Sequence, residues 1–78
     1  MQEMYVRAKS FEDVKAISAL AAQEEFQILI TDGICTVNAK SLLSLFSLNM
    51  DHPLLLRLDC SKEDCDAFRM KAGRYAVD

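Results

Sequence analysis

Residues 26–37 read Phe26-Gln-Ile-Leu-Ile-Thr31, then Asp32-Gly33, then Ile34-Cys-Thr-Val37. Two apolar runs with a preference for strands thus flank an Asp-Gly pair. This pair is the strongest short-range indication of a β-hairpin, because both turn residues need positive φ angles, which Asp and Gly tolerate. The stretch predicts two antiparallel strands with a tight turn at Asp32 and Gly33, and therefore a fold that contains an antiparallel sheet.

The residues before this hairpin predict a strand and a helix. Residues 2–8 alternate weakly between apolar and polar side chains, which indicates a first strand. Ser10-Phe-Glu-Asp13 is a capping-box pattern that favours a helix start. Apolar residues then recur at helical spacing and predict an amphipathic helix to about residue 23: Val14, Ile17, Leu20 and Ala21.

The residues after the hairpin predict two helices and one more strand. Asn38 can cap a helix over residues 39–48, which would end before Pro53. Residues 54–58, Leu-Leu-Leu-Arg-Leu, favour a strand because Pro53 and Asp59 bound the run. Ser61-Lys-Glu-Asp64 repeats the capping pattern and predicts a last helix that places Cys65, Phe68 and Ala72 on one face.

The element order is therefore β-α-β-β-α-β-α. We expect an α+β fold, in which three helices cover one face of a four-stranded, mostly antiparallel sheet. Seventy-eight residues have room for one core, so residues 1–78 are expected to form a single domain.

Charge and cysteine usage exclude several classes of function. Twelve acids against nine bases give a net charge of −3, which argues against direct binding of nucleic acid or of an anionic membrane. No stretch approaches the roughly 18 apolar residues of a membrane span, and the first residues do not resemble a secretory signal. Three cysteines, an odd number, fit the cytoplasm, where disulfides are rare.

The sequence also offers little chemistry. Cys60 and Cys65 have a C-x4-C spacing, which is not a zinc-ribbon pair, and no histidine lies close to them. His52 is the only histidine and precedes Pro53 in an expected turn. We therefore expect no metal, no cofactor and no enzymatic activity.

The helix predicted over residues 39–48 carries more apolar surface than one face can hold. Leu42, Leu45 and Leu48 mark one face, whereas Leu43 and Phe46 lie to its side. A sheet offers this helix only one face, so some of these side chains should reach solvent and indicate a protein partner. The alternative is a fully buried helix that packs against the other two helices.

A family resemblance is carried by residues 32–50, Asp-Gly-Ile-Cys-Thr-Val-Asn-Ala-Lys-Ser-Leu-Leu-Ser-Leu-Phe-Ser-Leu-Asn-Met. This segment resembles the centre of HPr, the histidine-containing phosphocarrier of the sugar phosphotransferase system. Its Val37-Asn-Ala-Lys-Ser41 portion is similar to the Gram-positive branch and to the catabolite-repression HPr-like proteins. Residues 63–68 match the same family more weakly. The resemblance implies the open-faced β-sandwich of HPr.

The resemblance also implies a regulatory member rather than a phosphocarrier. HPr carries its phosphorylated histidine in a Gly-Leu-His-x-Arg-Pro-Ala motif between the first strand and the first helix. Here residues 7–15 read Arg-Ala-Lys-Ser-Phe-Glu-Asp-Val-Lys, without a histidine. Glu12 and Asp13 add negative charge where the phosphate would bind.

By the same resemblance, Ser41 aligns with the serine that an ATP-dependent HPr kinase phosphorylates. Leu42, Leu43 and Phe46 align with the apolar surface that binds the kinase, enzyme I and a transcriptional regulator. Lys40 would partly neutralise a phosphate on Ser41. The expected function is a regulatory adaptor; the alternatives are a degenerate HPr paralogue with a purely structural or binding role, and a phosphocarrier that uses an unconventional residue.

Overall fold

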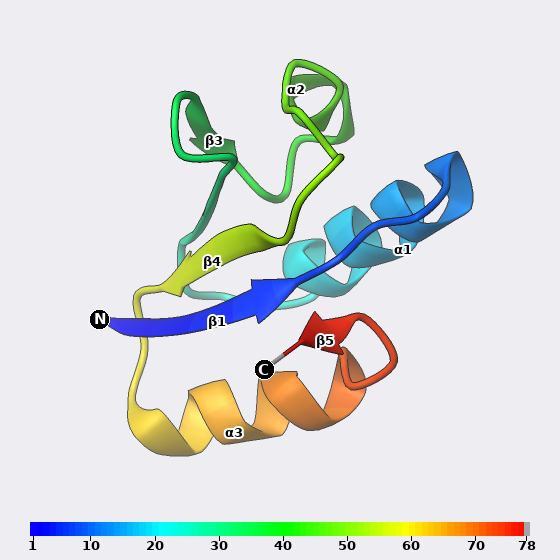
Figure 1. Cartoon of the computed structure of the whole chain (residues 1–78). Helices are drawn as coiled ribbons and strands as arrows, with labels where there is room; N and C mark the ends of the chain where they lie inside the picture. Colours follow the sequence, from blue (N-terminus) through cyan, green and yellow to red (C-terminus); the bar gives the residue numbers. More distant parts are fainter. Residues whose placement is uncertain (78) are drawn as a thin grey trace.

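The computed structural model describes residues 1–77, which form five strands and three helices (Figure 1). The predicted order β-α-β-β-α-β-α is confirmed, and one further strand follows it. The elements are β1 (Gln2–Val6), α1 (Phe11–Ala22), β2 (Ile28–Thr31), β3 (Thr36–Asn38), α2 (Leu42–Leu45), β4 (Leu54–Leu58), α3 (Lys62–Lys71) and β5 (Ala76–Val77). Among residues 1–77, no helix has the length and apolar content that a membrane span requires.

The sheet has the strand order β3-β2-β4-β1-β5, and every pairing is antiparallel. The prediction of four strands was therefore wrong. After α3 the chain turns back, and the Arg7 N–H donates to the Tyr75 carbonyl oxygen at 2.8 Å, which places Ala76 and Val77 beside β1. Two residues are too few for an alternating pattern, so no pattern along the chain indicated β5.

One face of the sheet is buried and the other is open. The central strand β4 buries Leu54, Leu56 and Leu58, and its neighbours β1 and β2 turn their buried residues to the same side: Met4, Val6, Ile28 and Ile30. Side chains from all three helices belong to this one cluster, among them Ile17, Leu45 and Phe68. The opposite face is exposed at Glu3, Tyr5 and Arg57, so the helices cover one face, as predicted.

The hairpin forms, but its turn lies one residue later than the sequence predicted. The Asp32 N–H donates to the Cys35 carbonyl oxygen at 3.2 Å, which leaves Gly33 and Ile34 as the central residues. Only Gly33 has a positive φ, of 100°. Gly at the first central position is typical of a type II′ turn. Asp32 instead contributes its carboxylate, whose Oδ1 accepts the N–H groups of Ile34 and Cys35 at 2.8 Å each.

Both long helices begin at the predicted serines. Ser10 Oγ accepts the Asp13 N–H at 3.2 Å, and Ser61 Oγ accepts the Asp64 N–H at 3.2 Å. Asp13 returns a hydrogen bond to the chain before its helix, since its Oδ2 accepts the Lys9 N–H at 2.9 Å. In this motif a hydroxyl accepts a hydrogen bond from a free amide at the helix start. The local sequence was therefore enough to predict where both helices begin.

The helix predicted over residues 39–48 was wrong in start and length. The Ala39 N–H donates to the Ile28 carbonyl oxygen at 2.9 Å, which continues the pairing of β2 with β3, and Ala39 is fully buried. Asn38 caps only a turn, because its Oδ1 accepts the Lys40 N–H at 3.0 Å. Ser41 is thus the N-cap of a one-turn helix.

Beyond α2 the chain continues in tighter turns. Phe46, Ser47 and Leu48 each donate a backbone N–H to the carbonyl oxygen three residues earlier. With about three residues per turn, side chains at intervals of three lie above one another. This explains why Leu45 and Leu48 are both buried and Leu42 packs against the core, although the regular helix has only four residues.

Candidate functional site

Two apolar side chains of the α2 region are left in solvent. Leu43 is 82% exposed and Phe46 is 48% exposed. They lie three residues apart, so they are neighbours on the outer side of the helical turn. The predicted surplus of apolar surface on this segment is confirmed for both residues. Leu42, in contrast, is half-buried against the core and belongs to the inner stripe.

Phe11 extends this surface from α1. It is 53% exposed, and its ring stacks on the ring of Phe46 with a centroid separation of 5.3 Å and an interplanar angle of 9°. The Lys15 Nζ lies 5.4 Å from the centroid of the Phe11 ring. Phe11, Leu43 and Phe46 form the surface that we call the apolar patch.

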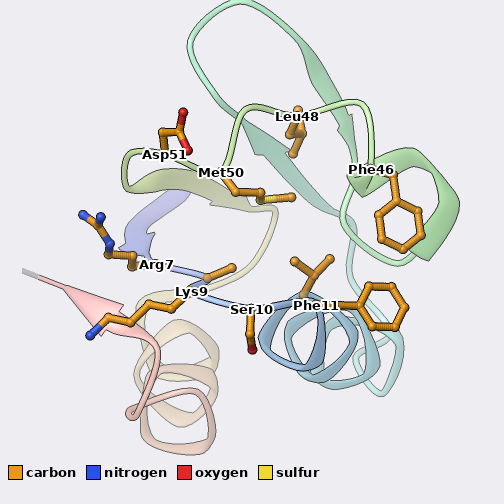
Figure 2. A pocket seen from close by; sticks show the side chains of 10 residues that line it. Arg7, Lys9, Ser10, Phe11, Phe46, Leu48, Met50 and Asp51 are labelled. Carbon is orange, nitrogen blue, oxygen red and sulfur yellow. The ribbon is translucent and has the colours of Figure 1, made fainter.

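A cavity of about 500 Å³ opens beside the apolar patch, between the β1–α1 loop and the loop after α2. Figure 2 shows Phe11 and Phe46 at one side of it, Arg7, Lys9 and Asp51 at the other, and Met50 between them. The remaining lining is mainly apolar: Ala8, Val14 and Leu48, with Ser10 at its edge. The cavity thus combines an apolar middle with charged side chains at one end.

Ser41 lies at the start of α2 and is half-buried. The sequence placed it within the first turn of a longer helix, but it is the N-cap residue, and its side chain accepts no hydrogen bond from a helix amide. The Ser41 Oγ instead accepts from the Ser44 Oγ at 3.0 Å. A single turn has too few aligned peptide groups for a strong dipole, so the expected stabilisation of a phosphate by the helix start does not apply.

Lys40 has a different role from the one expected. Its Nζ donates to the Glu24 carbonyl oxygen, beyond the end of α1, at 2.7 Å. The Glu24 carboxylate in turn pairs with Lys71 of α3 at 3.1 Å. Lys40 therefore joins the segment before α2 to the other two helices and is already engaged, which weakens its expected role as the partner of a phosphate on Ser41.

Asp32 fixes the loop after α2. Its Oδ2 accepts the Asn49 N–H at 2.9 Å, in addition to the two hairpin amides that Oδ1 accepts. These hydrogen bonds favour the charged form. The Asn49 N–H is the largest of the effects that lower the pKa of Asp32 from its ordinary 3.8 to about 2. The carboxylate thereby connects the hairpin turn to the chain that leads to Met50 and Asp51.

The remaining groups with chemical potential lie apart from the patch. His52 is exposed, its Nε2 is 3.3 Å from the Asn49 Nδ2, and it does not line the cavity beside the apolar patch. Burial, followed by the nearby Cys65 and acidic side chains, raises the pKa of the Cys60 thiol and so disfavours its reactive thiolate form. Within residues 1–77, no three His, Cys, Asp or Glu side chains gather as a metal site.

The structure thus unites two of the sequence-predicted residues, Leu43 and Phe46, and separates Lys40 from them. It adds Phe11, Arg7, Lys9 and Asp51, which the sequence did not single out as a site. The one indication in the sequence for Phe11 was its position as an aromatic residue directly after a helix cap. The contact of Phe11 with Phe46 joins positions 35 residues apart, which local patterns do not reveal.

No protein-family model matches the chain, and no curated protein matches it. The case for a family therefore rests on residues 32–50 and on the order of the elements.

Proposed function

We propose that this protein is a regulatory adaptor of the HPr type that binds a protein partner and does not carry phosphate on a histidine. The observation that carries the proposal is the apolar patch: Phe11 and Phe46 stack in solvent beside an exposed Leu43 and border a cavity. Exposed aromatic side chains next to a pocket are typical of residues that anchor a protein interface.

Two observations support the HPr type. Residues 32–50 resemble the HPr centre, and the first seven elements follow the order that this family has. The chain between β1 and α1, where HPr has its histidine, reads Arg7-Ala-Lys-Ser10 here, and this departure from HPr supports an adaptor without phosphohistidine transfer. The adaptor would act in the cytoplasm, and its partners would include an HPr kinase, enzyme I or a transcriptional regulator.

Phosphorylation of Ser41 would regulate this binding. The Ser41 hydroxyl does not cap the helix. Its phosphorylation would therefore break only the hydrogen bond with the Ser44 hydroxyl. A phosphate adds a charge of about −2 and three acceptors beside Leu42 and Leu43. Because Lys40 is bound to Glu24, the cations that neutralise this phosphate would come from the partner. The modification would thus favour partners with Arg or Lys and repel acidic ones.

The first experiment incubates the protein with HPr kinase and ATP and measures the intact mass. We expect the mass of one phosphate to be added, and none to be added to Ser41→Ala. The control variant is Ser47→Ala, which changes an exposed serine of the same segment. It should be phosphorylated like the wild type. If a Gram-positive HPr is phosphorylated in the same tube and this protein is not, the regulatory role is wrong, and the degenerate paralogue with a purely binding role replaces it.

The second experiment tests the apolar patch with the same kinase as the partner. Phe46→Ala should lower kcat/KM for Ser41 phosphorylation about tenfold, the effect of losing an aromatic interface anchor. Met70→Ala is the matched control, because Met70 is an equally apolar and 85% exposed side chain on α3. If the two variants reduce kcat/KM equally, the apolar patch is not the docking surface.

A further inference from the structure

Two of the three cysteines lie close together at the start of α3. Ser61 is the N-cap of this helix, so Cys60 directly precedes the cap and Cys65 follows it by four residues. Side chains at these two positions contact each other in the hydrophobic-staple arrangement. In agreement with this contact, Cys65 lies in the core cluster and Cys60 packs against it. After burial, Cys65 is also the group that most raises the pKa of the Cys60 thiol.

Backbone hydrogen bonds hold both cysteines in place. The Cys60 N–H donates to the Leu58 carbonyl oxygen at 3.0 Å, and the Cys65 N–H donates to the Ser61 carbonyl oxygen at 3.0 Å. The Ser61 Oγ accepts the Asp64 N–H at 3.2 Å and so fixes the turn between the two cysteines. Their backbones therefore keep one relative position as long as the helix cap is formed.

The two thiols differ in their access to solvent. Cys65 is 4% exposed, whereas Cys60 is half-buried, and both are free thiols. An oxidant therefore reaches Cys60 first. A second thiol beside an accessible one is the arrangement in which thiol–disulfide exchange is followed by closure of an internal disulfide.

We propose that Cys60 and Cys65 form a redox-reactive dithiol that a small-molecule disulfide oxidises to an internal disulfide. The rare disulfides of cytoplasmic proteins are usually transient and redox-sensing, so the bond is expected to form reversibly. Figure 1 shows that the start of α3 lies well away from α2. The site involves no residue of the apolar patch and stands independently of the function proposed for that patch.

The reaction proceeds by two exchange steps. The Cys60 thiol loses its proton and attacks one sulfur of the small disulfide, which forms a mixed disulfide and releases one half as a thiolate that takes up the proton. The Cys65 thiol then loses its proton and attacks the Cys60 sulfur, and the second half leaves in the same way. Two protein thiols are thus oxidised, and one disulfide is reduced to two thiols. Burial raises the pKa of Cys60, so its thiolate fraction is small and the first step is slow.

The experiment incubates the folded protein with glutathione disulfide, in a Cys35→Ser background that retains only the proposed pair. Cys35 is exposed, so this substitution leaves the core intact. N-Ethylmaleimide then blocks the remaining thiols, and trypsin cleaves at Lys62, between the two cysteines. We expect the intact mass to fall by two hydrogens without retained glutathione, and the peptides with Cys60 and Cys65 to be recovered as one disulfide-linked product. Excess reduced glutathione should restore both thiols.

The matched control is Cys65→Ser in the same background, which removes only the second thiol. It should retain one glutathione on Cys60. Glutathione that is retained while both thiols are present, or thiols that stay unreacted at every concentration of glutathione disulfide, would overturn the proposal. Linkage that forms in urea but not in the folded protein would overturn it as well. The linked peptides come from a protein with both cysteines, so this result does not depend on the folding of Cys65→Ser.

Discussion

The α2 and α3 regions both place leucine, cysteine or phenylalanine side chains over the same sheet face, but they differ in how much of their apolar surface is buried. In α3 the apolar residues form one stripe, and Phe68 is only 1% exposed. In the α2 region they form two stripes, and Phe46 is 48% exposed. One sheet face can bury one stripe of each helix, so the second stripe of the α2 region stays exposed to solvent.

The two regions also differ at their first residue. Ser61 and Ser41 are both N-cap residues with extended backbones, yet only Ser61 accepts a hydrogen bond from a helix amide. Ser41 follows a turn that strand pairing imposes, and its hydroxyl meets Ser44 instead. The cap hydrogen bond thus forms at Ser61, where the local sequence specifies the helix start, and not at Ser41, where strand pairing sets it.

The largest expected effect is at Phe68. Phe68→Ala should lower the free energy of unfolding by about 3–5 kcal/mol, because it empties a fully buried site. A domain of this size has roughly 4–12 kcal/mol in total, so the loss is a large share. Urea unfolding followed by circular dichroism measures it. A loss below about 1 kcal/mol would show that α3 packs no more tightly than α2.

A smaller effect on the free energy of unfolding should distinguish the three N-cap serines. Ser10→Ala and Ser61→Ala should each lower the free energy of unfolding by about 1 kcal/mol, the usual value of a lost N-cap. Ser41→Ala should change it by much less, because no amide loses its partner. Equal losses at Ser41 and Ser61 in urea titrations would contradict this difference.

The stacked pair of aromatic rings should contribute less to the free energy of unfolding than a buried ring does. A double-mutant cycle with Phe11→Ala and Phe46→Ala should give a coupling energy of about 0.5–1.5 kcal/mol, the range for stacked aromatic pairs. The free energy of unfolding of the four proteins in urea supplies it. A Phe46→Ala loss near that of Phe68→Ala would place Phe46 in the core and remove it from the apolar patch.

The smallest expected effect is a loss of stability that occurs only at acidic pH and concerns the α2 side of the molecule. Because its folded pKa is depressed to about 2, Asp32 stabilises the fold above its ordinary pKa of 3.8. This contribution is lost as the pH falls from about 4 towards 2. Urea unfolding at several pH values should show the loss in the wild type and not in Asp32→Asn.

The same titration can be followed residue by residue. The amide resonance of Asn49 should move with an apparent pKa of about 2, since its N–H donates to Asp32. Amides in the middle of α3 should not follow this titration. If the Asn49 amide does not move, the connection between the hairpin and the loop after α2 is not formed.

The sequence by itself determined the elements whose causes are local. The apolar run bounded by Pro53 and Asp59 predicted the strand β4. The serine caps fixed the starts of α1 and α3, and the spacing of Leu42, Leu45 and Leu48 separated an inner stripe from Leu43 and Phe46. Each depends on side chains within a few residues of one another.

The tertiary structure decided what depends on distant partners. The start of α2 was set by the hydrogen bond from Ala39 to Ile28, which exists only once β2 and β3 pair, and β5 exists only because β1 lies beside it. The apolar patch needs the contact of Phe11 with Phe46, which brings α1 to the α2 region. This surface forms where segments remote in sequence come together, so local periodicity and capping patterns could not predict it.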